Sequence, residues 1–571
     1  MGWLWGSFRV ASGWLCVPDA QVIRAYRSQF VIEKIFHEMK DRRIGAWWPL
    51  HHWTDSNIQV HGLYCTIAVL LRALLWRRAH RAGLRLSMSG LLEKLRLGSA
   101  SAGGRPWGDA VYVQGMPAPL PGTCDLAERL ASYPLLTALR ERRSRRFGLG
   151  MKMPAGPLAF ASRYPPAPLT EAEVAALAFA GGGITGHALA DLCYAPGGGG
   201  GIMAGLVART IASGDGLQAV ALVITNDEAT WLVRRPRELP PGDIPHLIEL
   251  GRKGEFTDLY RRCRVKLKDG RAATPAEPLF NINANRWSAH APGTTCFLPV
   301  NDTTFMYING VLEIFNETTG AFVLDERNSF RPAGLARFAR SRGGHLEDDP
   351  RQGRVATVRQ VEQFVTEFIT IEQGMMLQNF GLMAQALGLG GFPGFANHEF
   401  GWFQALGFRL ERMPASRYLG AGKMVSLAMS LLRRNLPVPY AVGLERKGEV
   451  LLKPFIPPYY RSMTEAVQAV ADAKFGPNGV FRGPSASTPW AKGSEITGQL
   501  PPVSQSAIAA ATAYCEYLWQ RYGRFPVYLT PYRTVLAFQA CHLDAEFYDR
   551  FYRPEALGES QREDFGRRHP S

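Results

Sequence analysis

The sequence predicts a globular chain in which helices and antiparallel strands are mixed, and three observations carry this prediction. Thr170 is followed three positions later by Glu173, the pattern of a helix that begins with a capping box. The apolar runs 217–225 and 230–233 are joined by an Asn-Asp turn, which is typical of a β-hairpin. The long apolar segment 362–387 leads into a glycine-rich run, where a helix is expected to stop.

Other periodic segments extend this prediction along the chain. We expect helices over 126–139, 463–473 and 508–521, a strand near 437–445, and a C-terminal helix that carries His542, Asp544, Phe547, Tyr548 and Tyr552. We expect His542 and Asp544 to pack against or cap that helix, with a substrate contact as the alternative. The run Gly391–Gly394 is expected to be a loop whose backbone can approach a planar ligand closely.

Composition excludes a wholly disordered or fibrous chain. The excess of positive charge is distributed unevenly between the first hundred residues and the rest of the chain. Of 571 residues, 46% are hydrophobic and 20% are charged, which is ordinary for a globular protein. The net charge of +16 would by itself favour a nucleic-acid or membrane partner. Residues 1–100, however, carry 14 Lys/Arg against 6 Asp/Glu, so the first sixth of the chain holds half of that excess.

The cysteine pattern and the apolar runs indicate a reducing compartment. The eight cysteines are scattered, and none forms a Cys-x2-Cys pair. The longest apolar run, residues 63–76, is short and is interrupted by Arg72, so we expect no membrane partner and a cytoplasmic location. We expect no metal site, and we interpret the polar stretch 343–352, with His345, Glu347, Asp348 and Asp349, as exposed surface.

The N-terminal region contains the motif Tyr26–x2–Gln29–x3–Glu33–x6–Lys40. Over about residues 26–97 it resembles the C-terminal end of DDE-type insertion-sequence transposases, with Gln29 in place of an arginine. In that family the glutamate is the last of three metal-binding carboxylates, and two-metal chemistry requires all of them. Only Asp19 is acidic before Glu33, so we expect a helical fragment without cleavage activity. We expect nucleic-acid binding no stronger than nonspecific contact by residues 1–97.

A change in composition marks the boundary between this region and the rest of the chain. Residues 98–123 are rich in Gly, Pro, Ser and Ala, as linkers are. The predicted organisation is a transposase-like fragment (1–97), a linker (98–123), a main domain (124–460) with an insertion at about 236–354, and a C-terminal extension packed on that domain (461–571).

The string Arg142-Arg143-Ser144-Arg145-Arg146 is the most informative one in the chain. Guanidinium groups make charge-assisted, often bidentate bonds to phosphate, and a serine hydroxyl can add another bond. The string therefore predicts a phosphate site, although a solvated basic patch would have the same composition.

Four motifs in order resemble the nitroreductase family of flavin-dependent oxidoreductases, over about residues 130–460. They are the Arg142–Ser144–Arg146 string, the Pro168-Leu169-Thr170 helix start, the Arg209-Thr210-x2-Ser213-Gly214 loop, and the helix with Gln378-Asn379 and Leu387–Gly390. The resemblance implies an α+β fold, in which an antiparallel-rich sheet is flanked by helices. The insertion at 236–354 departs from the family pattern and suggests extra strands or a lid.

The resemblance also implies FMN as the cofactor. Arg142, Ser144 and Lys453 would then hold its phosphate, and Arg146 would lie near the N1–C2=O edge of the ring. The other implied contacts are Arg143, Ser213, Gly214, Gln378, Asn379, Gly391, Phe392, Pro393 and Gly394, the last four as backbone near N5. The flavin itself carries the hydride chemistry, and no residue is assigned as acid or base.

Three functional hypotheses follow from these patterns. The first is an FMN-dependent oxidoreductase that passes hydride from a donor such as NAD(P)H to a small electron acceptor, with a homodimer as an open alternative to a monomer. The second keeps the fold as a catalytically inactive flavin-binding or protein-interaction module. The third is a DNA-binding remnant function of the N-terminal region.

Overall fold

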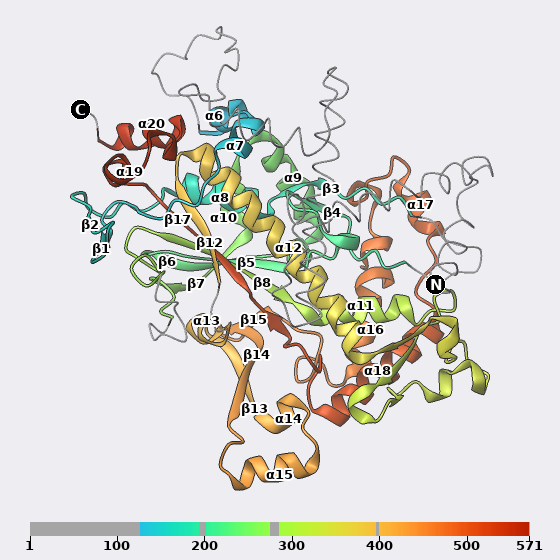
Figure 1. Cartoon of the computed structure of the whole chain (residues 1–571). Coiled ribbons are helices and arrows are strands. Elements are labelled where there is room, and N and C mark those ends of the chain that lie inside the picture. The colour runs from blue at the N-terminus through green and yellow to red at the C-terminus, as the bar shows by residue number, and fades with distance from the viewer. Residues whose placement is uncertain (1–125, 193–200, 275–284, 396–398, 570–571) are drawn as a thin grey trace, which may run out of the picture. The chain divides into compact units, whose positions relative to one another are not determined.

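The structure is a computed structural model, and it describes residues 126–192, 201–274, 285–395 and 399–569 (Figure 1). All of these residues fall in one of the two units into which the chain divides, Pro121–Ser571. The transposase-like motif of residues 26–97 and the Gly/Pro-rich segment 98–123 lie outside the described residues. What the sequence predicts for them stays a prediction.

The centre of the described chain is a sheet in which every neighbouring pair of strands is antiparallel (Figure 1). The strand order is β12-β17-β8-β5-β6-β7, and short β16 also pairs with β8. The strands are β12 (Gly390–Phe395), β17 (Leu536–Cys541), β8 (Thr295–Asp302), β5 (Val220–Thr225), β6 (Ala229–Val233), β7 (Arg264–Asp269) and β16 (Tyr532–Arg533). Helix and antiparallel sheet are thus combined as the predicted α+β class requires.

Strand β5 shows why this sheet is buried on both faces. Val220, Leu222 and Ile224 point to one face and Ala221 and Val223 to the other, because side chains alternate along a strand. All six residues of β5 are buried, and it pairs with β6 through the predicted hairpin turn. The first face is covered by α8 (Glu171–Gly182) and α12 (Val358–Leu387), and the second by α13 (Glu399–Ala405) and the β13–β14 pair.

The long helix α12 is the main cover of the first face. The sequence predicts its end correctly, because Gly388 adopts the left-handed conformation of a helix C-cap, with φ 81°. The helix begins four residues earlier than predicted, at Val358, because the Thr357 side chain and Gln360 form a capping box. Phe380 of α12 lies 5.0 Å from Phe297 of β8 and 5.5 Å from Phe538 of β17, ring centre to ring centre.

Two central strands come from segments far apart in the sequence. Strand β8 lies within the insertion predicted at 236–354, and all eight of its residues are buried. Strand β17 lies within the C-terminal segment 461–571 and is inserted between β12 and β8. The C-terminal segment therefore supplies part of the sheet as well as helices that pack beside it.

The prediction of a loop at Gly391–Gly394 is wrong, because these residues belong to strand β12. They pair with β17, and Gly391 lies opposite Ala540 and Pro393 opposite Phe538. Strand β12 is at the edge of the sheet, where a proline can be accommodated although it cannot donate a hydrogen bond. A β-carbon at Gly391 would lie 2.4 Å from the ring of Phe538, so the absence of a side chain serves packing within the sheet.

A second core is helical and is built by α11 (Thr303–Ile314), α16 (Met463–Phe475) and α18 (Gln505–Tyr522). The sequence predicts α16 and α18 correctly to within three residues at each end. Tyr307 of α11 and Tyr514 of α18 are fully buried, and their hydroxyls lie 2.7 Å apart.

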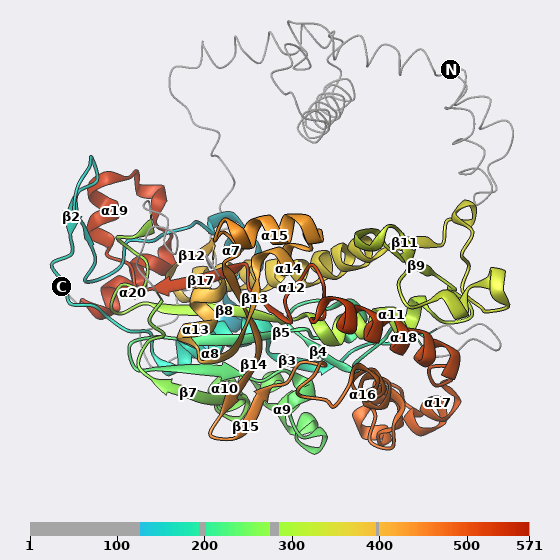
Figure 2. The same ribbon diagram turned by 90° about the horizontal axis from the view of Figure 1, so that it is seen from below.

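A separate three-stranded sheet is formed by β13 (Phe408–Pro414), β14 (Pro437–Arg446) and β15 (Glu449–Leu452), and it contains the strand predicted near 437–445. Between β13 and β14 the chain forms α14 (Ala415–Leu419) and α15 (Lys423–Leu431). Figures 1 and 2 show these two helices side by side at the end of β13 and β14.

The remaining elements are shorter. The helices are α6 (Leu126–Ser132), α7 (Leu135–Glu141), α9 (Ile244–Lys253), α10 (Phe256–Cys263), α17 (Gly493–Gln499), α19 (Ala545–Phe551) and α20 (Glu559–Arg568). The strands are β1 (Lys152–Met153), β2 (Phe160–Ala161), β3 (Ile184–His187), β4 (Val207–Arg209), β9 (Phe322–Asp325), β10 (Arg331–Pro332) and β11 (Val355–Thr357). None of the helices in the described ranges has the length and apolar content needed to cross a bilayer.

Candidate functional site

The arginine string follows two short helices rather than the single helix predicted over 126–139. Helices α6 and α7 are separated at Tyr133-Pro134, because proline disfavours helical backbone in the residue before it. Helix α7 ends at Glu141, and the chain then runs extended past the strand β12, where Arg145 bridges to Gly391.

Within the string, Arg145 is the buried arginine. Its side chain donates to the carbonyl of Ala556 at 2.7 Å, to Oε1 of Gln385 at 2.8 Å and to the carbonyl of Glu141 at 3.2 Å. Only 4% of the residue is exposed, and burial lowers the pKa of its guanidinium. Arg145 therefore fastens the string to α12 and to the C-terminal segment.

The neighbouring residues Arg143, Ser144 and Arg146 line a pocket of about 660 Å³. Arg143 and Ser144 are exposed, and among the described residues the Arg143 guanidinium donates to the carbonyls of Arg140 and Arg142. Across the pocket are aromatic residues and the turn that follows α19: Trp287, Phe547, Tyr548, Tyr552, Arg553 and Glu555. The cavity is thus lined by cationic and aromatic side chains together. Its acidic lining residue is Glu555.

Arg146 is held in a defined position by neutral partners. Its Nη1 donates to Oδ1 of Asn285 at 2.6 Å. The guanidinium carbon lies 5.6 Å from the centre of the Trp287 ring and 5.5 Å from that of Phe392, within the range of cation–π attraction. The structure therefore brings Arg146 and Phe392 together, two residues that the sequence assigns to the same cofactor.

Other predicted cofactor residues lie along α12, away from the pocket lining. The stem of Arg142 packs on Gly381, where an added β-carbon would lie 3.1 Å from its Cδ. Asn379 donates to the carbonyls of Ala180 and Thr210 and so joins α8 to α12. Gln378 is exposed.

Ser213 and Gly214 contact an earlier turn of α12. The Ser213 hydroxyl donates to Glu372 and accepts from the backbone N–H of Gln218 at 2.8 Å. A β-carbon at Gly214 would meet the ring of Phe368. Gly381 and Glu372 are separated by roughly 14 Å along the axis of α12. The predicted cofactor residues therefore contact this helix at widely separated points. Lys453 lies elsewhere, with its Nζ 3.9 Å from the centre of the Tyr460 ring.

The donor groups of the pocket fit a phosphate ester that carries a planar ring. Arg143, Arg146 and Arg553 supply positive charge and Ser144 a hydroxyl, which suits a phosphate. Trp287 and Tyr552 supply ring surfaces, which suit a ring system, whereas the Phe547 ring is buried and stacks on Phe147. The pocket lining contains no histidine or cysteine.

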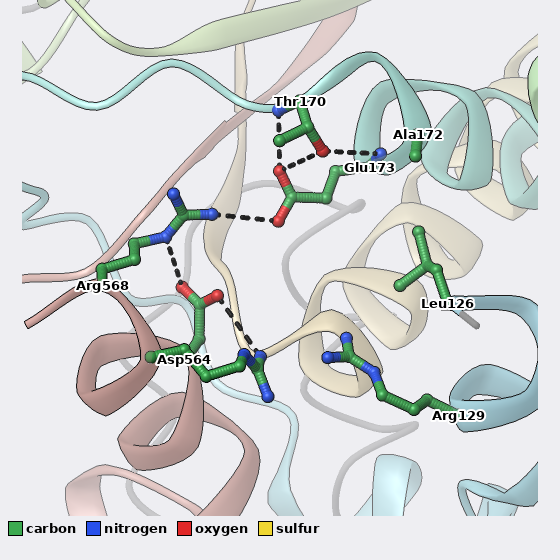
Figure 3. Close-up of a pocket in the computed structure, with 8 residues that line it drawn as sticks. Leu126, Arg129, Thr170, Ala172, Glu173, Asp564 and Arg568 are labelled. Atoms are coloured by element: carbon green, nitrogen blue, oxygen red, sulfur yellow. Dashed lines mark hydrogen bonds and ion pairs between the residues drawn. The ribbon is translucent and has the colours of Figure 1, made fainter. Parts of the chain in front are cut away.

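A second charged cluster joins α8, α20 and the segment after β17. Nδ1 of His542 lies 2.8 Å from Oδ2 of Asp564, and its Nε2 lies 3.4 Å from Oε2 of Glu173. Arg568 bridges the two carboxylates, at 3.2 Å from Glu173 and 3.4 Å from Asp564 (Figure 3). Arg567 lies 3.5 Å from Asp564.

The pKa values of Glu173 and His542 are both shifted in the direction that favours the charged form of the side chain. Burial works against ionisation of Glu173, yet the His542 contact and the Thr170 hydrogen bonds lower its pKa to about 2. Burial likewise favours the neutral form of His542, but the bonds to Asp564 and Glu173 outweigh it and raise its pKa. The imidazolium is therefore placed between two carboxylates.

Glu173, His542 and Asp564 include ligand atoms within 4.8 Å of one another, a spacing that admits a metal ion. The two ring nitrogens of His542 point to different carboxylates, however, and a metal ion needs one shared point. Arg568 already occupies the side between the acids. We interpret the cluster as a buried ion-pair network that fastens α20.

The sequence contains no local signal for this network. Glu173 is read as a capping residue, and it does form the capping box with Thr170. His542 precedes α19 instead of lying on a helix, and Asp544 caps α19 by accepting from the N–H of Glu546 at 3.0 Å. The three charged partners meet only because β17 brings the C-terminal segment beside α8.

The acidic stretch 343–352 is engaged in contacts of its own. Glu347 pairs with Arg340 at 2.9 Å, Asp348 accepts from Ser341, and Asp349 accepts from the N–H of Arg351. Glu347 is buried, which differs from the expected exposed surface.

Comparison with known proteins supplies no family for this chain: no protein-family model matches it, and no significant match is found among curated proteins.

Proposed function

We propose that the chain is an FMN-dependent oxidoreductase of nitroreductase type, with the flavin bound at the Arg143–Ser144–Arg146 pocket. The observation that carries the proposal is the convergence of these residues with Arg553 and the aromatic side chains of Trp287 and Tyr552 around one cavity. Phosphate and planar ring are the two ends of FMN, joined by a ribityl chain, and the cavity offers complementary groups for each end.

The pocket residues divide into two roles under this proposal. Arg143 and Ser144, exposed at the pocket, would bind the phosphate, with Arg553 as a further cation. Arg146, held between the Trp287 and Phe392 rings, would place its charge beside the ring system. Bound FMN would supply hydride transfer through its N5, and a positive side chain near the ring favours the anionic reduced state.

A nicotinamide donor such as NAD(P)H, a small electron acceptor, a homodimer and a cytoplasmic location belong to the same proposal. The inactive flavin-binding module is the competing reading. Turnover separates the two: an active enzyme oxidises NAD(P)H when a quinone or nitroaromatic is supplied, whereas the module retains flavin without turnover.

The decisive experiment compares FMN with riboflavin, which lacks the phosphate. Arg143→Gln combined with Ser144→Ala should weaken FMN binding by about a hundredfold or more, because two charge-assisted hydrogen bonds of roughly 1.5–3 kcal/mol each are removed. Riboflavin binding should stay unchanged. Arg142→Gln is the matched control, since its stem packs on Gly381 outside the pocket. A colourless protein that binds neither added flavin would contradict the proposal.

A further inference from the structure

Helices α14 and α15, with the turns around them, present apolar side chains to the outside. Leu419, Met424, Leu431 and Leu436 are each between 66% and 85% exposed. Val425, Leu427 and Leu432 are each more than half exposed. A surface helix of a globular protein normally buries its apolar side chains and exposes polar ones. This part of the chain does the reverse.

The polar side chains of the same segment are used internally. Asn435 accepts from the N–H of Ser416 at 2.8 Å and donates to the hydroxyl of Ser430 at 3.0 Å. The Ser426 hydroxyl donates to the carbonyl of Ala421. Hydrogen bonds therefore hold α14 and α15 together, while the seven apolar side chains named above stay exposed among the described residues.

Charge is equally one-sided in this segment. Residues 412–444 contain no Asp or Glu, and their five basic residues are Arg412, Arg417, Lys423, Arg433 and Arg434. Arg433 and Arg434 follow α15, are exposed, and form no ion pair within the described part of the chain. Exposed apolar residues flanked only by cations are what an interfacial membrane segment presents to anionic lipid.

The position of α14 and α15 makes contact with a flat surface feasible. They lie at the end of the β13–β14 pair, away from the central sheet (Figure 1). The absence of a spanning helix among the described residues is compatible with a segment that lies in the interface without crossing the bilayer.

We propose that α14 and α15 form a docking element for the surface of a membrane that contains anionic lipids. A second copy of this chain fits the charge less well, because a symmetric self-contact would bring the exposed Arg433 and Arg434 of the two copies close together. The proposal departs from the sequence-based expectation of no membrane partner, and it is independent of the flavin.

The test is co-sedimentation of the full chain with phosphatidylcholine vesicles, with and without phosphatidylglycerol. We expect binding to the mixed vesicles and little to phosphatidylcholine alone. Leu427→Glu with Leu431→Glu should reduce that binding about a hundredfold or more, because two leucines no longer enter the apolar layer. Arg433→Gln with Arg434→Gln should reduce that binding about thirtyfold, because each of the two cations contributes a similar share of the attraction to an anionic surface.

Leu189→Glu is the matched control, because Leu189 is 83% exposed and lies outside this element. It should bind vesicles as the wild type does. The oligomeric state of each variant is measured by light scattering in parallel. Failure of the full chain to bind the mixed vesicles overturns the proposal. So does a dimer that the Leu427→Glu, Leu431→Glu variant converts to monomer while no vesicle binding is seen.

Discussion

The pocket around Arg143 and the cluster around His542 use similar side chains for opposite purposes. In the cluster, Arg567, Arg568 and the imidazolium of His542 meet the carboxylates of Glu173 and Asp564. In the pocket, the guanidinium groups of Arg143 and Arg146 meet backbone carbonyls, an amide oxygen and aromatic rings, all of them neutral. Charge that is compensated within the chain holds helices in place, whereas uncompensated charge remains available for an anionic ligand.

The strongest way to test this contrast is to remove the central cation of the cluster. His542→Ala leaves two buried carboxylates that share one bridging arginine, and breaking a buried ion pair typically costs about 3–5 kcal/mol. We expect a loss of that size in urea denaturation. His246→Ala is the control, because His246 is exposed on α9, and it should change stability by less than about 0.5 kcal/mol. Equal midpoints for the two variants would show that the cluster contributes nothing.

The next prediction separates two arginines of one string. Arg145→Gln removes the hydrogen bonds to the partly buried carbonyls of Ala556 and Glu141, so we expect a loss of stability of about 1–3 kcal/mol. Arg143→Gln should leave stability unchanged and weaken FMN binding. If both variants lost stability equally, Arg143 would be a structural residue and the phosphate assignment would fail.

The sequence predicts a feature correctly when the residues that determine the feature lie close together in the chain. The Thr170–Glu173 capping box, the β5–β6 hairpin and the Gly388 helix stop are each encoded within a few residues, and all three are confirmed. The interpretation of Gly391–Gly394 as a loop fails because its strand conformation depends on pairing with β17. A local sequence pattern cannot identify a pairing strand that lies so far along the chain.

The candidate site shows the same limit within a single string. Arg142, Arg143, Arg145 and Arg146 are alike in sequence, yet only Arg145 is buried, because Gln385 and Ala556 happen to lie beside it. The network of Glu173, His542 and Asp564 likewise joins residues from opposite ends of the described chain. Composition predicts a cationic string, but tertiary contacts decide which of its side chains line a pocket.

The smallest expected effect is the dependence of the His542 network on pH. The folded pKa of His542 is raised, so its contribution is complete below the unfolded pKa of about 6.5 and is lost as pH rises through the folded value. The folded pKa of Glu173 is lowered to about 2, so its contribution is present above its ordinary value of 4.5 and is lost as pH falls toward 2. Both contributions are therefore complete between about pH 4.5 and 6.5.

His542→Gln isolates this effect, because glutamine can donate one hydrogen bond to a neighbouring carboxylate but cannot become charged. The difference in unfolding free energy between wild type and variant should be largest near pH 6 and should shrink steadily toward pH 9. A difference that stays constant from pH 6 to pH 9 would mean that His542 stabilises the fold by packing alone. The network would then resemble an ordinary buried contact, and its contrast with the uncompensated charge of the Arg143 pocket would rest on Arg567 and Arg568.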